Sequence, residues 1–211
     1  KGHSAVDKRP PLVTDVRRKG LAGLVLAAGA SIRLGQPKQL VTIDGRSLLQ
    51  HAVDKCLPVC PLGVTVVTGA DREVINQTLR GESVLIMHNS AWRDGLASSI
   101  IAGISSIPAD SQAVLLMLCD QPNLSTAELA QLVSVWARHS DQVVASRFGG
   151  TFGAPAIFPR AVFPMLEALQ GDRGAKPVIE QLANPILVDV PGAELDIDRP
   201  EDLDRLRNSW Q

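Results

Sequence analysis

Two cations, Arg33 and Lys38, follow the first strongly apolar run of the chain and lie in a loop of small residues. The apolar run covers residues 24–27, and residues 28–31 read Ala-Gly-Ala-Ser. Small residues let backbone N–H groups approach an anion closely, and consecutive amides form an anion-binding nest. An Arg fork and a Lys ammonium can then neutralise phosphate charge. The stretch predicts a cradle for nucleotide phosphates, although a tight turn with two surface cations would use the same residue types.

Aspartates close two later apolar segments. Asp120 directly follows the nearly all-aliphatic run 114–119, and Asp196 and Asp198 alternate with an isoleucine just before Pro200. Alternate residues of an extended segment point to the same side. Mg²⁺ usually takes one or two protein carboxylates together with substrate phosphates. Of Asp196 and Asp198, Asp198 lies nearer the turn. We therefore expect Asp120 and Asp198 to hold Mg²⁺. A helix-capping role for Asp120 is the alternative.

Two serines, Ser98 and Ser99, stand near the start of a predicted helix that follows Gly95. A serine-rich helix N-terminus can offer hydroxyls and free N–H groups to a base or a phosphate. The same pattern also describes an ordinary helix cap, with Trp92 packed over the helix start. Both interpretations stay open from these residues alone.

Short apolar runs alternate with helical patterns from Gly20 onward. The alternation predicts a single doubly wound, Rossmann-like α/β domain with a mostly parallel mixed sheet over residues 21–211. In such sheets ligands bind beyond the carboxyl ends of the strands, at a switch point. The predicted strands are 21–27, 64–68, 84–88, 113–118, 143–146, 156–158, 186–190 and 195–197. The predicted helix starts include Ser47, Asp71, Ser125, Pro177 and Pro200.

The composition excludes several classes of protein. The chain has 211 residues, 45% of them hydrophobic, which is enough for one sizeable core. Its 21 Lys and Arg are balanced by 22 Asp and Glu, so nothing favours a surface that coats nucleic acid. No apolar run approaches the ~20 residues of a membrane span.

Segment 1–20 is polar and reads as a flexible leader without a secretory signal. The 3 cysteines do not pair evenly, which favours a reduced, cytoplasmic protein.

Five blocks of the sequence resemble motifs of the molybdenum cofactor nucleotidyltransferases, especially the cytidylyltransferase branch. They occur in the family's order between residues 24 and 202, so the resemblance covers nearly the whole domain. The blocks are Leu26-Ala27-Ala28-Gly29-x-Ser31-x-Arg33-Leu34-Gly35-x-Pro37-Lys38, Asn89-x-x-Trp92-x-x-Gly95-x-x-Ser98-Ser99, Cys119-Asp120-Gln121-Pro122, Gly171-Asp172-x-Gly174-Ala175-Lys176 and Asp196-Ile197-Asp198-x-Pro200-Glu201-Asp202.

The resemblance implies a Mg²⁺-dependent nucleotidyltransferase. It would transfer CMP from CTP to the terminal phosphate of molybdopterin or molybdenum cofactor, release pyrophosphate, and hand its product to an apo-molybdoenzyme. In the family L-A-A-G goes with CTP and L-x-G-G with GTP, so Ala27-Ala28-Gly29 favours CTP. The implied catalytic residues are Arg33, Lys38 and Asp120. The implied nucleotide-binding residues are Leu26, Ala27, Ala28, Gly29, Ser31, Arg33, Lys38, Ser98, Ser99 and Asp120. The acceptor side would use Asp172 and Lys176, and the metal would use Asp120 and Asp198.

Three departures from the family motifs qualify this reading. Leu34 replaces Met, Lys176 replaces Arg and so loses the bidentate fork, and Arg199 replaces Thr beside a predicted metal ligand. The alternatives are a nucleotidyltransferase that uses GTP or a sugar-phosphate acceptor, and a non-catalytic chaperone for the molybdenum cofactor.

Overall fold

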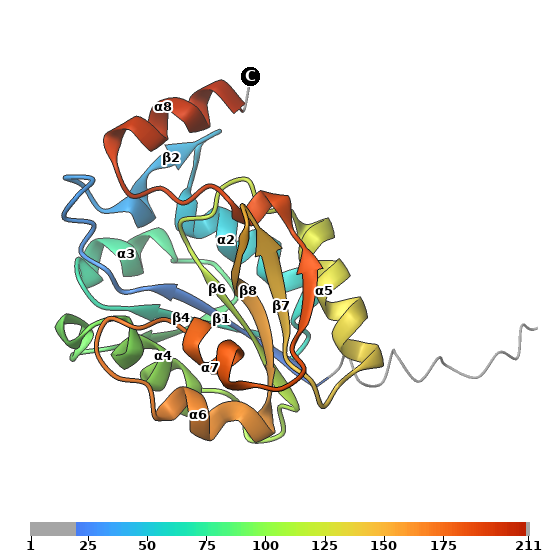
Figure 1. The fold of residues 1–211 in the computed structure, drawn as a ribbon. Coiled ribbons are helices and arrows are strands. Elements are labelled where there is room, and N and C mark those ends of the chain that lie inside the picture. Colours follow the sequence, from blue (N-terminus) through green and yellow to red (C-terminus); the bar gives the residue numbers. More distant parts are fainter. Residues whose placement is uncertain (1–19, 210–211) are drawn as a thin grey trace, which may run out of the picture.

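A seven-stranded sheet in the order β5-β4-β1-β6-β8-β7-β9 runs through the protein (Figure 1). The computed structural model describes residues 20–209, with side chains as far as residue 206. Apart from Gly20, the predicted leader 1–20 lies outside the described residues. β8 is antiparallel to β6 and β7, whereas β1, β4, β5 and β6 are parallel neighbours, as are β7 and β9. The strands are β1 (Leu21–Ala27), β4 (Val64–Thr68), β5 (Val84–His88), β6 (Ala113–Leu118), β7 (Val144–Phe148), β8 (Thr151–Pro159) and β9 (Ile186–Asp189).

Helices cover both faces of this sheet, which confirms the predicted fold. β1 is buried at every position, and its Val25 and Leu24 belong to two different apolar clusters. Side chains of α2, α3 and α5 join the cluster of Val25, and side chains of α4, α6 and α7 join that of Leu24. These helices are α2 (Leu48–Cys56), α3 (Arg72–Thr78), α4 (Leu96–Ser105), α5 (Thr126–Arg138), α6 (Phe163–Glu167) and α7 (Lys176–Gln181).

The predicted helix caps had different outcomes. Ser47 and Ser125 each accept a hydrogen bond from the backbone three residues on, and both form complete capping boxes. Asp71 stands at the start of α3, but its backbone is left-handed at φ 54° and its side chain makes no capping hydrogen bond. Within residues 20–209, no helix combines the length and apolar character needed to cross a membrane.

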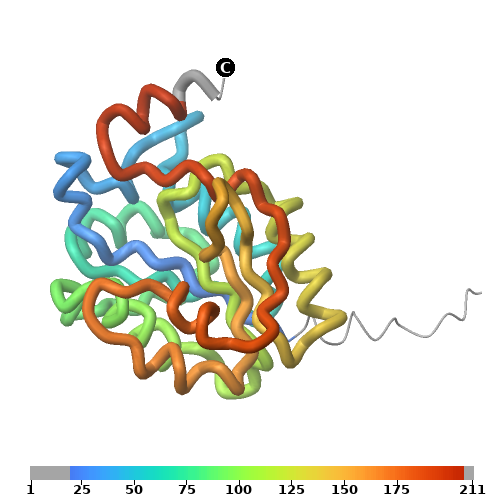
Figure 2. Tube along the Cα trace, viewed as in Figure 1, coloured from blue at the N-terminus to red at the C-terminus, as the bar shows by residue number. Residues whose placement is uncertain are grey.

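A small third cluster is made of residues that lie outside the seven-stranded sheet. It joins the hairpin of β2 (Thr42–Ile43) and β3 (Arg46–Ser47) to the last helix, α8 (Pro200–Ser209), which lies beside β2 (Figures 1 and 2). The strand predicted at 195–197 is wrong, because this segment forms no ladder with any other part of residues 20–209. The alternation remains, since Ile197 is buried in the third cluster while Asp196 and Asp198 line a cavity.

Strand order explains where a ligand can bind. The chain leaves β1 toward β4 on one side, and β6 returns on the other side. The loops after β1 and β6 therefore diverge at the carboxyl edge of the sheet, which is the switch point of this fold.

Gly95 begins α4 and packs directly on the loop around residue 171. Its φ is +101°, and a Cβ there would lie 2.4 Å from the carbonyl oxygen of Gly171. The N–H of Ala97 donates to that same oxygen at 3.1 Å. The start of α4 is thus fixed against a segment distant in sequence.

We expect Gly95→Ala to destabilise the fold more than Gly81→Ala. Gly81 has a similar φ of +87° but open space around its Cβ position, so it controls for backbone strain alone. A residue other than glycine held at a sparsely populated positive φ costs about 1–3 kcal/mol. Overpacking at Gly95 should lower the free energy of unfolding by about 1–3 kcal/mol more. Urea unfolding would measure both, and equal losses would contradict the close contact.

Candidate active site

A cavity of about 970 Å³ lies at the switch point. The loop after β1 forms one wall, and the start of α4 with the turn before it forms another. The end of β6 and the segment 196–198 close the third side. Its size suits a nucleotide-sized ligand.

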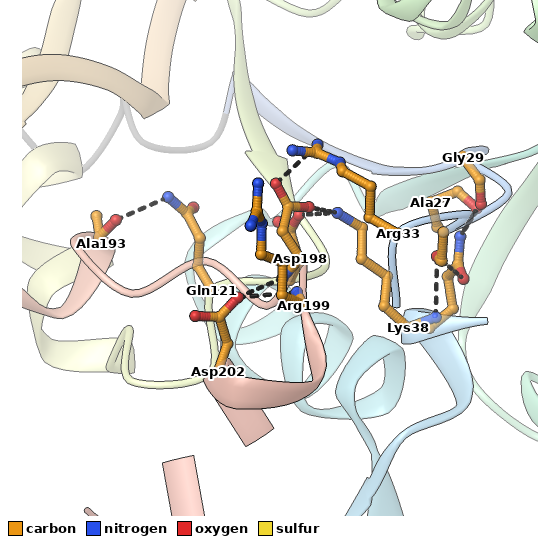
Figure 3. A network of polar contacts seen from close by, with 12 residues as sticks. Ala27, Gly29, Arg33, Lys38, Gln121, Ala193, Asp198, Arg199 and Asp202 are labelled. Carbon is orange, nitrogen blue, oxygen red and sulfur yellow. Dashed lines mark hydrogen bonds and ion pairs between the residues drawn. The ribbon is translucent and has the colours of Figure 1, made fainter. Parts of the chain in front are cut away.

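The ammonium of Lys38 lies between two carboxylates at this third side (Figure 3). Nζ donates to Oδ2 of Asp120 and, at 3.0 Å, to Oδ1 of Asp198. Arg33 donates from Nη2 to the other oxygen of Asp198, also at 3.0 Å. The Lys38 and Asp120 side chains are only 18% and 9% exposed, so their interaction is partly shielded from water. The predicted phosphate-binding cations and the predicted metal ligands therefore contact one another.

Burial and charge act in opposite directions on these groups. Burial lowers the pKa of Lys38, but the charge and hydrogen bond of Asp120 outweigh it and hold that pKa above its ordinary value. Burial also opposes ionisation of Asp198, yet the hydrogen bond and charge of Lys38 lower its pKa. Asp196 differs: burial, then the nearby charge of Asp120, raise its pKa to about 7. Lys38 and Asp198 are thus charged at neutral pH.

The carboxylates fit a divalent cation that takes only part of its shell from protein. Oδ1 of Asp120 is buried and has no hydrogen-bond partner among the described residues. Within residues 20–209 no group of three or more His, Cys, Asp or Glu side chains is arranged to hold a metal. A pair of carboxylates supplemented by phosphate oxygens and water is the usual environment of Mg²⁺. Asp120 and Asp198 could together hold such an ion.

A buried glutamine holds the loop after β1. Gln39 lies in the short helix η1 (Lys38–Leu40), is 0% exposed, and donates from Nε2 to the carbonyls of Ala27 at 2.9 Å and Gly29 at 2.7 Å. Ser31 accepts a hydrogen bond from the Lys38 N–H at 3.0 Å. Gln39 is not among the predicted residues, and its only signal in the sequence is its place beside Lys38, the last residue of the motif. Hydrogen bonds from within the protein therefore shape the loop.

Ser98 and Ser99 lie in different surroundings, although both bind Asn89. Nδ2 of Asn89 donates to the hydroxyls of both Ser98, at 2.8 Å, and Ser99, at 3.0 Å. Ser99 lines the cavity, whereas the Ser98 hydroxyl lies 2.8 Å from the carbonyl oxygen of Gly95 and closes the turn. Beside them the Arg93 guanidinium covers the ring of Trp92, 4.3 Å from its centroid.

The two predicted acceptor-side residues lie apart. Asp172 lines the cavity and accepts a hydrogen bond from the Leu96 N–H at 3.3 Å. Lys176 instead donates to the hydroxyl of Thr151 at 2.8 Å and lies 5.0 Å from the Phe152 ring centroid. Neither Lys176 nor Ser98 belongs to the cavity lining of the described chain. The predicted residues that do meet there are Leu26, Ala27, Ala28, Gly29, Ser31, Arg33, Lys38, Ser99, Asp120, Asp172 and Asp198.

The turn that carries Asp120 is held from two sides. Gln121 donates from Nε2 to the carbonyls of Ala154 and Ala193, both at 3.1 Å; the bond to Ala193 is drawn in Figure 3. Lys55 of α2 donates to the carbonyl of Pro122 at 2.7 Å. These contacts fix the backbone on which the Asp120 carboxylate stands.

Known proteins resemble this chain over most of its length. Nicotine blue oxidoreductase of Paenarthrobacter nicotinovorans is 28% identical over 201 residues, covering 90% of this chain and 95% of that protein. The molybdenum cofactor cytidylyltransferase of Escherichia coli is 23% identical over 188 residues, covering 85% and 92%.

Among solved structures, Rv0371c of Mycobacterium tuberculosis superposes with a TM-score of 0.79 at 26% identity, covering 90% of this chain and 98% of that one. A second structure of that protein, in complex with manganese, has a TM-score of 0.76 at 24% identity and covers 90% and 99%. The family profile of the MobA-like NTP transferase domain matches residues 23–186. The chain therefore belongs to the family of MobA-like NTP transferase domains.

Proposed function

We propose that the protein transfers CMP from CTP to the terminal phosphate of molybdopterin or molybdenum cofactor and releases pyrophosphate. The observation that carries this proposal is the cavity in which Lys38 and Arg33 meet the carboxylates of Asp120 and Asp198. Membership of a nucleotidyltransferase family and a cytidylyltransferase among the relatives support it. The three free cysteines, all buried, agree with a reducing, cytoplasmic location, where the product could pass to an apo-molybdoenzyme.

The reaction needs positioning and charge neutralisation more than proton transfer. An oxygen of the acceptor's terminal phosphate forms a bond to the α-phosphorus of CTP. The bond from that phosphorus to the bridging oxygen of the β-phosphate breaks, and pyrophosphate leaves with that oxygen. Because the attacking phosphate is already anionic, it requires no general base. Preorganised cations then supply most of the stabilisation.

The described cations and carboxylates suit these tasks. Lys38 and Arg33 would neutralise the triphosphate and the leaving pyrophosphate, Lys38 as a point charge and Arg33 as a planar fork. Asp120 and Asp198 would hold Mg²⁺, which supplies further positive charge to the phosphates when it is bound. The amides around Ala28 and Gly29, whose loop is shaped by Gln39, would hold the nucleotide.

The base and the acceptor would contact different residues of the cavity lining. We assign Ala27, Ala28 and Ser99 to the nucleotide side. Asp172 lies on the acceptor side, whereas Lys176 would reach the acceptor only after its ammonium leaves Thr151. The substitution of Lys for the family's Arg at this position therefore changes a residue whose present contacts lie outside the cavity.

We expect Lys38→Ala and Asp120→Ala each to lower turnover by roughly 10²–10³, since each removes a group that stabilises or anchors transition-state charge. The measurement is pyrophosphate release with Mg²⁺, CTP and molybdopterin. Asp120→Asn keeps the side chain's shape and should lose turnover to a similar degree.

Arg138→Ala provides the matched control for Lys38→Ala. Arg138 is an exposed cation on α5, and its removal changes the net charge equally. This variant should release pyrophosphate at the wild-type rate. Thermal melting would establish that each variant is folded at the assay temperature. Wild-type turnover by folded Lys38→Ala or Asp120→Ala would contradict the assignment.

The choice of base is a separate prediction. In a competition of CTP, GTP and ATP at equal concentration, we expect the cytosine dinucleotide to dominate the products. Preferential use of GTP would overturn the role assigned to Ala27 and Ala28 but keep the reaction class. Pyrophosphate release with a sugar phosphate, and none with molybdopterin, would show that the acceptor is a sugar phosphate. Tight binding of CTP and molybdopterin without any pyrophosphate would favour a chaperone that delivers the cofactor.

A further inference from the structure

We propose that Asp202 of α8 is a positioning residue for Asp198, and that α8 aligns the metal-binding carboxylate with the phosphate loop. The inference rests on the proposed metal role of Asp198. In the sequence Asp202 only ends a motif of the family resemblance, and its position just after Pro200 predicts a helix-terminal charge.

Asp202 binds the backbone on which Asp198 stands. Its Oδ2 accepts hydrogen bonds from the N–H groups of Asp198, at 3.1 Å, and Arg199, at 2.9 Å (Figure 3). Its Oδ1 lies 3.7 Å from Arg205 one turn later in the helix. A side chain at the third helical position that reaches back to the residue before the helix is the second half of a capping box. Here that arrangement fixes the residue that would bind metal.

The direction of the Asp198 carboxylate depends on this backbone. The side chain is 38% exposed, and its two oxygens are bound separately, Oδ1 by Lys38 and Oδ2 by Arg33. The packing is therefore too open to fix the side chain alone. Groups that orient the ligands of a metal typically contribute 10–100-fold to metal affinity.

An apolar contact of α8 acts on the same geometry. Leu206 of α8 packs in one buried cluster with Leu34, which follows Arg33, and with Ile197, which precedes Asp198. Both ends of the Arg33–Asp198 ion pair are thus attached to one small core. The Ile197 N–H also donates to the carbonyl of Asp120 at 3.0 Å, which joins the second carboxylate to this assembly.

The test is the affinity of the full chain for Mn²⁺, measured by electron paramagnetic resonance with CTP present and a CTP-only blank. Mn²⁺ replaces Mg²⁺ because both prefer oxygen ligands. Asp198→Ala is the reference for loss of a ligand. We expect Asp202→Ala to weaken Mn²⁺ binding about tenfold or more. Asp202→Asn should remain much closer to the wild type, because its amide oxygen still accepts both hydrogen bonds.

Two further variants separate positioning from charge and from stability. Glu201→Ala removes a carboxylate from the exposed surface of the same turn and should bind Mn²⁺ as the wild type does. Leu206→Ala leaves Asp202 in place and should weaken binding in the same direction, by less. Thermal melting identifies any variant that is unfolded; if Asp202→Ala is, Asp202→Asn and Leu206→Ala carry the test.

The outcomes distinguish this inference from the proposed function. Wild-type Mn²⁺ affinity in folded Asp202→Ala would overturn the inference, as would equal losses in Asp202→Asn and Asp202→Ala. If the wild type binds Mn²⁺ through Asp198 but releases no pyrophosphate, the proposed reaction fails while the positioning role stands. If the wild type is active, the rate of Asp202→Ala is also measured against Mg²⁺ concentration. A higher Mg²⁺ concentration for half-maximal rate in this variant, at a little-changed maximal rate, supports Asp202 as a positioning residue.

Discussion

The partly buried ammonium of Lys38, shared by Asp120 and Asp198, is the interaction on which the site depends. Asp120 lies 82 positions after Lys38 in the chain, and Asp198 lies 160 positions after it. The interaction therefore brings the loop after β1, the end of β6 and the segment before α8 to one point. Removing one member of such a pair leaves an uncompensated charge away from water, at a cost of about 3–5 kcal/mol when the pair is buried. The loop, the strand end and α8 are therefore held together by the groups that would perform the chemistry.

This arrangement also limits how a polyphosphate can bind. Lys38 and Arg33 balance the charges of Asp120 and Asp198, so the centre has little surplus positive charge for an incoming triphosphate. If the two cations turn toward phosphate, the carboxylates lose their partners. A divalent ion arriving with the nucleotide would satisfy them, which gives a physical reason for the metal in the proposed reaction. Oδ1 of Asp120, which has no hydrogen-bond partner within residues 20–209, is the atom already available for that exchange.

Much of this organisation could be predicted from the sequence, because it depends on local pattern. β1, β4, β5 and β6 coincide with their apolar runs, and Ser47 and Ser125 cap helices as expected. The predictions failed where the direction of a side chain depends on packing against residues that are distant in sequence. Segment 195–197 alternates because Ile197 packs on α8 and not because it joins a ladder. Lys176 turns to a strand 25 residues away in sequence, and no local pattern reports that contact.

The departures from the family motifs can be explained by what each position uses: its apolar volume, its backbone or its charge. Leu34 contributes only apolar volume to the cluster with Leu48 and Leu206, so exchange of Met for Leu preserves what the position needs. Arg199 is bound through its backbone N–H by Asp202, a contact that any residue other than proline can make. By contrast, Lys38 and Asp120 contact each other through their charged atoms, which a residue of another charge type could not replace. Leu34 and Arg199 thus depart from the motifs where only apolar volume or backbone is used, and Lys176 departs where the side chain contacts Thr151 outside the cavity, whereas Lys38 and Asp120 keep the motif residue.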